Sequence, residues 1–324
     1  MRKKAFSALL FLVMTSLACG LTTRERASSP TLPGAGQPAP SASPEASPTP
    51  AQTAALPEPH RGVERDITYC EADGVPLKAD IYFAQSSPGG SPLLIFIHGG
   101  GWTSGSRSGG MGFEGLPALT AAGYTLASID YRLAPQYKMP DMIRDVKCAV
   151  RSFRAHAAEY GIDPERIAVL GASAGGQLAA MIGTADASAG FDTGEYSRYS
   201  SRVRAVVDMA GPADFRTPFF SNYRQAALQI FGTSDPNDPL FQASSPVNWV
   251  SPDDPPFLIL HGEKDESVPL SQSQELYEKL TAAGVRAELV VIHNAGHAMD
   301  SPDQSPTRAE LVQKILEFLQ TNLK

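Results

Sequence analysis

The stretch "GASAGG" at residues 171–176 places a single hydroxyl group, that of Ser173, among glycines and alanines. An apolar run at residues 166–171 precedes it, and a helical pattern at residues 174–183 follows. A sharp turn from strand to helix forces its central residue into a strained backbone conformation that bulky neighbours would obstruct. Backbone N–H groups at the start of the helix would stabilise negative charge beside that residue. The pattern predicts a nucleophilic serine, and a Gly/Ala-rich turn with a serine by chance is the alternative.

A serine hydroxyl becomes a good nucleophile when a base takes its proton and an acid orients that base. Asp265, in "HGEKDESVP", follows an apolar run and is the predicted acid, because functional groups gather beyond the strand ends of parallel sheets. Glu263 and Glu266 are its competitors, with surface charge as their other interpretation. His297, in "NAGHAMD", follows the last predicted strand and is the predicted base.

Other histidines and a glycine run complete the set of polar groups at predicted strand ends. The segment "HGGGW" at residues 98–102 contains consecutive glycines, which let backbone N–H groups face a cavity and stabilise an oxyanion. His98 is expected to hold this loop in shape. His261 and His293 end strands and are expected to make hydrogen bonds in the core.

The elements that must position these residues alternate between strand and helix. Residues 65–70 and 77–84 predict an antiparallel pair of strands, and residues 92–101, 125–132, 166–171, 203–211, 256–262 and 287–296 predict further strands. Helical patterns cover residues 116–124, 140–161, 174–183 and 306–323, with Gly161 expected to close the second of them. Repeated strand–helix units predict an α/β fold, with a mostly parallel central sheet and helices on both faces.

Residues 211–255 interrupt this alternation and are rich in aromatic side chains. The aromatic residues are Phe215, Phe219, Phe220, Tyr223, Phe231, Phe241 and Trp249. We interpret the segment as a small lid-like insertion over the C-terminal edge of the sheet, suited to aryl or short acyl groups.

The N-terminal part of the chain has the composition of a targeting segment followed by a spacer. Residues 1–18 combine positive charges at Arg2, Lys3 and Lys4 with a short apolar stretch, which predicts a signal peptide. Cys19 follows in "SLACG", a pattern similar to a bacterial lipobox, so we expect a lipidated Cys19 on an exported, membrane-anchored protein; simple cleavage and secretion is the alternative. Residues 19–60 are rich in Pro, Ser and Ala and predict a disordered tether, which leaves residues 61–324 as the catalytic domain.

The charge and the remaining cysteines narrow the possible partners. The net charge is −7 and no basic patch is evident, which argues against nucleic acid as a partner. Cys70 and Cys148 could pair in an exported domain or remain separate buried thiols. The His, Cys and acidic residues do not have metal-ligand spacing, so we expect no metal.

Six segments together resemble the α/β-hydrolase esterases. These are "HGGGW" (98–102), "DYRLAP" (130–135), "YGIDPERI" (160–167), "GASAGG" (171–176), "HGEKDESVP" (261–269) and "AGH" (295–297). They are most similar to the bacterial feruloyl-esterase-like carboxylesterases, near the hormone-sensitive-lipase type. The order of nucleophile, acid and histidine along the chain is that of this fold. Two departures from the hormone-sensitive-lipase type stand out: Ala172 replaces its usual acidic residue, and "HGEKDESVP" differs from its acid motif. That segment looks more like the feruloyl-esterase-like or dienelactone-hydrolase style, and dienelactone hydrolases usually carry a cysteine where this chain has Ser173.

The resemblance implies a serine esterase without a cofactor. Ser173, Asp265 and His297 would form its triad, and the N–H groups of Gly100, Gly101 and Ala174 its oxyanion hole. The expected substrates are short-chain or aryl esters, either small molecules or polysaccharide-linked feruloyl or acetyl groups. The lipid anchor would be its only membrane contact. An arylformamidase- or peptidase-like amide hydrolase and a non-catalytic surface protein on a hydrolase scaffold are the other functions considered.

Overall fold

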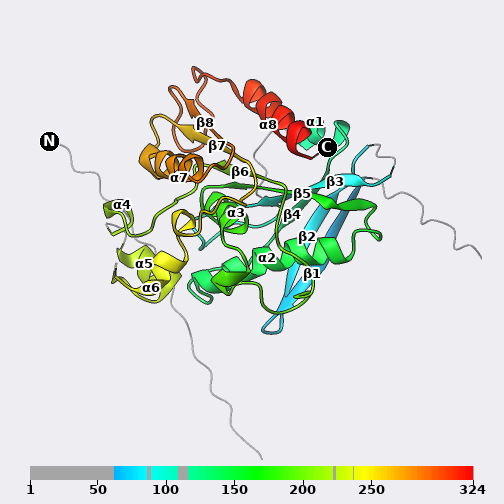
Figure 1. The fold of residues 1–324 in the computed structure, drawn as a ribbon, viewed down its shortest axis with the longest axis horizontal. Helices are drawn as coiled ribbons and strands as arrows, with labels where there is room; N and C mark the ends of the chain where they lie inside the picture. Colours follow the sequence, from blue (N-terminus) through cyan, green and yellow to red (C-terminus); the bar gives the residue numbers. More distant parts are fainter. Residues whose placement is uncertain (1–61, 86–88, 109–115, 222–223, 236, 324) are drawn as a thin grey trace, which may run out of the picture. The chain divides into compact units, whose positions relative to one another are not determined.

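Eight strands form one sheet in the computed structural model, which describes residues 62–323 except 86–88, 109–115, 222–223 and 236. The predicted signal peptide, Cys19 and the tether lie outside the described residues. The strands are β1 (Val63–Ala72), β2 (Val75–Tyr82), β3 (Ser91–Ile97), β4 (Thr125–Ile129), β5 (Ile162–Ala172), β6 (Ala205–Met209), β7 (Phe257–Gly262) and β8 (Ala287–Ile292). Their order is β1-β2-β4-β3-β5-β6-β7-β8 (Figure 1).

The sheet is mostly parallel, as predicted. β1 pairs with β2 and β2 with β4 in antiparallel fashion, whereas every neighbouring pair from β4 to β8 is parallel. The apolar run of β3 explains its central position, because its side chains enter cores on both faces. Leu93, Ile95 and Ile97 pack on one face, and Leu94 and Phe96 on the other.

Helices cover both faces of this sheet (Figure 1). α2 (Met139–Ala155), α3 (Ala174–Thr184) and α7 (Leu270–Ala282) contribute to the core on one face, and α1 (Leu116–Ala121) and α8 (Arg308–Asn322) to the core on the other. α7 was not among the predicted helices, because Leu276 and Leu280 are its only fully buried large apolar side chains in a mainly polar sequence. Within the described part of the chain, no helix has the length and apolar character to cross a membrane.

The prediction that Gly161 closes the second helix is wrong, since α2 ends at Ala155. His156 is the residue at which the helical conformation is lost, with φ −103° and ψ 20°. Its backbone N–H and its ring nitrogen Nδ1 both bond Ser152 O, at 3.0 and 2.9 Å. Gly161 instead adopts a positive φ of 60° in the turn that leads into β5.

Residues 211–255 break the strand–helix alternation, as predicted, and form an insertion with its own aromatic core. It holds α4 (Pro218–Ser221), α5 (Arg224–Phe231), α6 (Pro239–Ala243) and the 3₁₀ turn η2 (Pro246–Asn248). Four phenylalanines are buried and pack edge to face or stacked: Phe215, Phe220, Phe231 and Phe241. Trp102 of the "HGGGW" segment joins them, with its ring centroid 5.5 Å from that of Phe215. These rings therefore fill the insertion rather than line a binding surface; Tyr223 lies outside the described residues.

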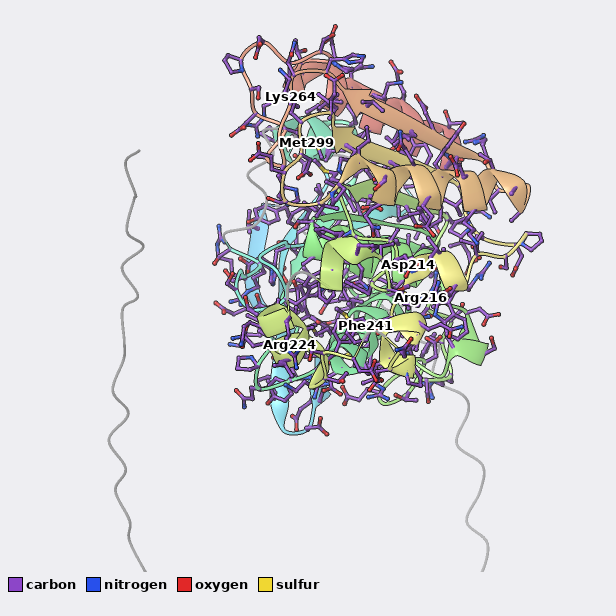
Figure 2. All side chains as sticks on the ribbon, turned by 90° about the vertical axis from the view of Figure 1, so that its left-hand side faces the viewer. Asp214, Arg216, Arg224, Phe241, Lys264 and Met299 are labelled. Atoms are coloured by element: carbon purple, nitrogen blue, oxygen red, sulfur yellow. A yellow bond between two sulfur atoms is a disulfide. The ribbon has the colours of Figure 1, made fainter. Side chains whose placement is uncertain are left out.

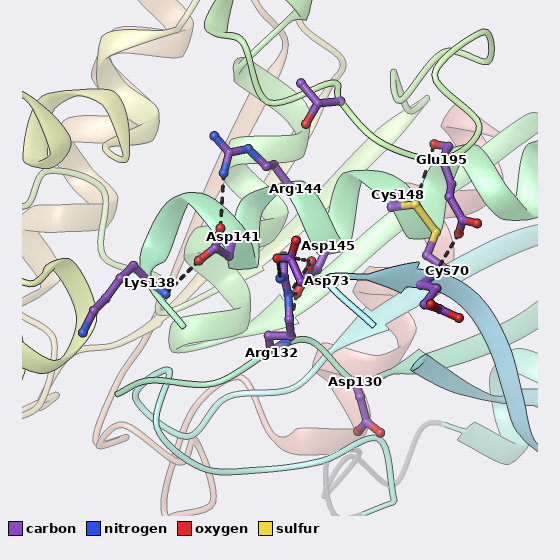
Figure 3. Close-up of polar contacts among 12 residues, drawn as sticks. Cys70, Asp73, Asp130, Arg132, Lys138, Asp141, Arg144, Asp145, Cys148 and Glu195 are labelled. Carbon is purple, nitrogen blue, oxygen red and sulfur yellow. Dashed lines mark hydrogen bonds and ion pairs between the residues drawn. A yellow bond between two sulfur atoms is a disulfide. The ribbon is translucent and has the colours of Figure 1, made fainter. Parts of the chain in front are cut away.

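A disulfide joins Cys70 of β1 to Cys148 of α2, which decides between the two possibilities left open by the sequence (Figure 3). Near it, the buried Arg132 guanidinium donates to Asp145 on α2 through Nε and Nη2, at 2.8–3.1 Å. Among the described residues, Cys70, Cys148 and Glu195 are the group of three potential metal ligands, and the disulfide takes up both thiols. The bond closes a loop between residues 78 positions apart.

We expect the double substitution Cys70→Ser and Cys148→Ser to lower the free energy of unfolding by about 2–4 kcal/mol, because the unfolded chain gains the entropy of the opened loop. Urea unfolding of the oxidised protein and the variant measures this difference. Dithiothreitol should shift the wild-type curve toward that of the variant and leave the variant unchanged. Coincident curves for the oxidised protein and the variant would contradict this stabilisation.

Candidate active site

Ser173 occupies the turn between β5 and α3 in a conformation that non-glycine residues rarely adopt. Its φ is 56° and its ψ is −120°. Such a conformation costs about 1–3 kcal/mol and persists only where the surroundings enforce it. Here the Ser173 N–H donates to Met209 O at the end of β6, at 2.7 Å. The turn is thus held by the neighbouring strand.

The small residues around Ser173 are explained by close backbone approaches. A Cβ atom at Gly175 would lie 2.1 Å from Ile97 O at the end of β3. Because real Cβ atoms do not approach that closely, glycine is required for the first turn of α3 to rest on β3. The helix start, with its free N–H groups, is therefore fixed beside both the serine and the loop that follows β3.

The three predicted residues Ser173, Asp265 and His297 meet at this edge. His297 Nε2 lies 2.8 Å from Ser173 Oγ, and His297 Nδ1 lies 2.6 Å from Asp265 Oδ2. A carboxylate can only accept, so Nδ1 carries the ring proton and Nε2 accepts from the serine hydroxyl. The His297 side chain is 29% exposed, whereas that of Asp265 is fully buried. This series of hydrogen bonds allows His297 to take the proton of the serine hydroxyl as the serine oxygen attacks an electrophile.

Asp265 is selected over its competitors by burial and hydrogen bonding. Burial would raise its pKa, but hydrogen bonds from His261, His297 and the Val268 N–H outweigh burial and hold the pKa well below its usual value. Its carboxylate is therefore charged at neutral pH. Glu263 and Glu266 are both exposed, and Glu263 accepts a hydrogen bond from Asn294 N instead.

The loops that carry the acid and the base are joined directly. Lys264 N donates to Ala295 O at 2.8 Å, and Lys264 Nζ donates to Asn294 Oδ1 at 2.8 Å. In the view of Figure 2, Lys264 and Met299, which belong to these two loops, are both labelled in the upper part of the molecule, and Asp214 and Arg216 of the insertion are labelled below them. These two hydrogen bonds between the loops fix the position of His297 relative to Asp265.

The glycine loop after β3 lies against the nucleophile. A Cβ atom at Gly99 would be 3.4 Å from Ser173 Cβ, and one at Gly100, with φ 113°, would be 2.1 Å from Ser104 O. Among the described residues, none accepts a hydrogen bond from the backbone N–H groups of Gly100, Gly101 or Ala174. Unpaired N–H groups beside a nucleophile are suited to binding an oxyanion.

Gln177 is a site residue that the sequence analysis missed. Its buried side chain accepts from Trp102 Nε1 at 3.1 Å and donates to Ser244 O at 2.9 Å. It therefore links the glycine loop, the helix after the nucleophile and the insertion. The signal was a single amide in the otherwise small and apolar helix "AGGQLAAMIG".

The other strand-end histidines have different roles from one another. His98 shapes its loop as predicted, since it bonds Gly99 O through Nδ1 at 2.7 Å and stacks on Tyr131 at 4.3 Å. The prediction for His293 is wrong: its side chain is 65% exposed and faces Glu263 at 3.5 Å. β8 ends at Ile292, so the chain has already left the sheet at His293. His261 is fully buried, as expected.

Comparison with known proteins identifies a family and several similar esterases. A family model, BD-FAE, matches residues 79–280. Esterase LipC of Mycobacterium tuberculosis is 34% identical over 67% of this chain and 55% of its own length. An esterase of Thermogutta terrifontis with bound propionate is 28% identical, with a TM-score of 0.65 over 80% of this chain and 94% of that one. A truncated carbohydrate esterase from gut microbiota is 27% identical, with a TM-score of 0.66 over 80% of this chain and 95% of that one. The chain spans about half the length of the curated relatives it matches.

We expect Ser173→Gly to be more stable to unfolding than Ser173→Ala by about 1 kcal/mol, because glycine tolerates the observed φ and ψ without a Cβ penalty. Chemical denaturation of the two variants measures the difference, which is the cost of a Cβ atom at this φ and ψ less the greater entropy of glycine in the unfolded chain. An alanine variant that is more stable than the glycine variant by about 0.5–1 kcal/mol or more would show that the turn stores no strain.

Proposed function

This chain belongs to the BD-FAE family of α/β-hydrolases, and we propose on that basis that it is a serine carboxylesterase that works through an acyl-enzyme. The observation that carries the proposal is the continuous chain of hydrogen bonds from Ser173 Oγ through His297 to Asp265, at 2.8 and 2.6 Å. The esterases among its relatives and structural neighbours support the same reaction class.

The mechanism follows from the positions of these groups. Ser173 Oγ attacks the ester carbonyl carbon while its proton passes to His297 Nε2. The buried carboxylate of Asp265 stabilises the imidazolium that forms. The N–H groups of Gly100, Gly101 and Ala174 bind the oxyanion of the tetrahedral intermediate. His297 then gives the proton to the leaving alcohol, and the same steps with water release the acid and restore Ser173.

We propose short-chain acyl esters as the preferred substrates within this class. Four phenylalanines of the insertion, Phe215, Phe220, Phe231 and Phe241, are buried against one another and against Trp102, so these four rings are not available to bind an aryl group. The similar Thermogutta terrifontis esterase is described with propionate bound, which favours small acyl groups. The similar carbohydrate esterase extends the proposal to acetyl or feruloyl groups carried by polysaccharides.

We expect the full chain, purified in detergent, to hydrolyse p-nitrophenyl acetate and butyrate faster than the octanoate. Ser173→Ala should lower kcat by roughly 10⁴–10⁶-fold, because it removes the attacking oxygen. Methyl ferulate and acetylated xylan, assayed with the wild type and with Ser173→Ala, test whether the enzyme hydrolyses feruloyl and acetyl esters of polysaccharides. Assays of p-nitroacetanilide with the same two proteins test amide hydrolysis.

A fluorophosphonate that phosphonylates activated serines provides a second readout. Mass spectrometry of the labelled protein should find the adduct on Ser173. Hydrolysis that persists in Ser173→Ala, or labelling elsewhere, would overturn the mechanism. Faster turnover of the anilide than of any ester would make the chain an amide hydrolase instead.

We further propose that the enzyme is exported and anchored to the bacterial membrane through a lipid on Cys19, with residues 19–60 as its tether. The Cys70–Cys148 disulfide supports export, because such bonds persist in oxidising compartments. We expect radiolabelled palmitate to be incorporated into the wild-type protein and not into Cys19→Ala, and the variant to move from the membrane fraction to the soluble one. An unlabelled wild type would rule out the anchor.

A further inference from the structure

The buried carboxylate of Asp265 receives more donors than the mechanism requires. Oδ1 accepts from the Ser267 and Val268 N–H groups, both at 2.8 Å. Oδ2 accepts from His297 Nδ1 at 2.6 Å, and His261 Nε2 lies 3.3 Å from the same oxygen. A carboxylate offers about four lone-pair sites, so these four donors fill its capacity. The fourth is a second histidine on the oxygen that faces His297.

The protonation of His261 follows from its partners. Its Nε2 lies 2.9 Å from Val268 O as well as 3.3 Å from Asp265 Oδ2. Both oxygens can only accept, so Nε2 carries a hydrogen that they share. Its Nδ1 lies 2.7 Å from Ser273 Oγ on α7, whose hydroxyl can donate to it. The ring is fully buried at the end of β7 and held at both nitrogens.

We propose that His261 is a positioning residue for the triad: its Nε2–H holds the Asp265 carboxylate in the rotamer that bonds His297 and offsets part of the negative charge that His297 faces. The inference rests on the esterase function proposed above and names a residue that acts on the reaction through Asp265.

The Asp265 side chain carries a charge that solvent does not reach. A fully buried carboxylate that loses one donor either keeps an unsatisfied lone pair or turns to recover one, and both outcomes are costly. Because the Val268 N–H bonds Oδ1 and the Val268 carbonyl bonds His261, the ring and the acid loop fix each other. Rotation of Asp265 would break the 2.6 Å bond to His297.

The groups around His261 allow the direction of a pH effect to be derived. Two carboxylates face the ring, those of Asp265 and of Asp208 on β6, and α7 presents the hydroxyl of Ser273. Removal of the Nε2–H leaves more of the Asp265 charge to stabilise protonated His297 and makes Asp265 itself easier to protonate. Both changes move the loss of activity at low pH to higher pH.

Two variants of similar size separate the donor from the rest of the ring. The amide nitrogen of His261→Gln reaches the place of Nε2, whereas that of His261→Asn reaches only the place of Nδ1. We expect His261→Asn to lower kcat about 10- to 100-fold with little change in KM, by analogy with the loss found when a group that orients a metal-binding side chain is removed. The acid limb of its kcat/KM profile should move up by about 0.5–1 pH unit. His261→Gln should keep kcat within about threefold and the limb near that of the wild type.

A second measurement does not depend on activity. With ¹³C-labelled histidine, NMR titration of His297 should give a higher midpoint in His261→Asn than in the wild type or His261→Gln. Leu280→Ala serves as a matched control, because it opens a cavity in the buried core seven residues after Ser273 on α7. This variant should destabilise the fold without moving the His297 midpoint.

The outcomes distinguish the two proposals. If the wild type hydrolyses no ester and the fluorophosphonate leaves Ser173 unlabelled, the esterase function fails, and the His297 midpoints still report on His261. If both His261 variants lose kcat equally, with unshifted acid limbs and unshifted His297 midpoints, His261 serves only to support the fold and the inference is overturned.

Discussion

The whole site depends on the backbone hydrogen bond from Ser173 N–H to Met209 O and on the close packing that makes it possible. That bond, at 2.7 Å, ties the strained turn after β5 to the end of β6. On the other side, α3 rests on β3 with no room for a side chain at Gly175. The nucleophile is therefore fixed by its two neighbouring strands. The glycine loop after β3 is then in contact with Ser173, and β7 and β8, one and two strands beyond β6, present the acid and the histidine at the same edge.

The electrostatics of the site follow from excluding water from one carboxylate. The Asp265 side chain is buried, and four N–H donors take the place of water around its carboxylate. These donors keep the carboxylate charged. Asp208, buried nearby on β6, is a contrast. It accepts one hydrogen bond, from Gly211 N–H, and its Oδ2 has no partner among the described residues. Burial accordingly raises the pKa of Asp208 to about 6, despite that hydrogen bond and the nearby His261. The number of donors thus separates a carboxylate suited to orient a histidine from one that is not.

Local patterns in the sequence were sufficient for the sheet and for the three side chains that meet at its edge, because parallel strands bring their carboxyl ends together whatever lies between them. They were not sufficient where the outcome depends on a partner distant in sequence. His261 and His293 both end apolar runs, yet one is buried against Val268 and Ser273 and the other is exposed. Gly161 could close a helix, but α2 already ends at Ala155. The phenylalanines of the insertion could equally have lined a pocket or filled a core, and only their mutual contacts decide.

The insertion and the glycine loop are packed together through Trp102, which follows the glycines in sequence and contacts the aromatic rings of the insertion. Its ring packs in the aromatic core of the insertion with Phe215, and its Nε1 donates to Gln177 on the helix that begins at Ser173. Gln177 in turn bonds Ser244 O in the insertion. A displacement of the insertion would therefore move Trp102 and, with it, the adjoining N–H groups of Gly100 and Gly101. The insertion is also joined to α7, because Gln272 Oε1 accepts from the Ala213 and Asp214 N–H groups at 2.8 and 2.9 Å. Sequence changes in the insertion can therefore alter how an ester carbonyl is held without changing any residue of the triad.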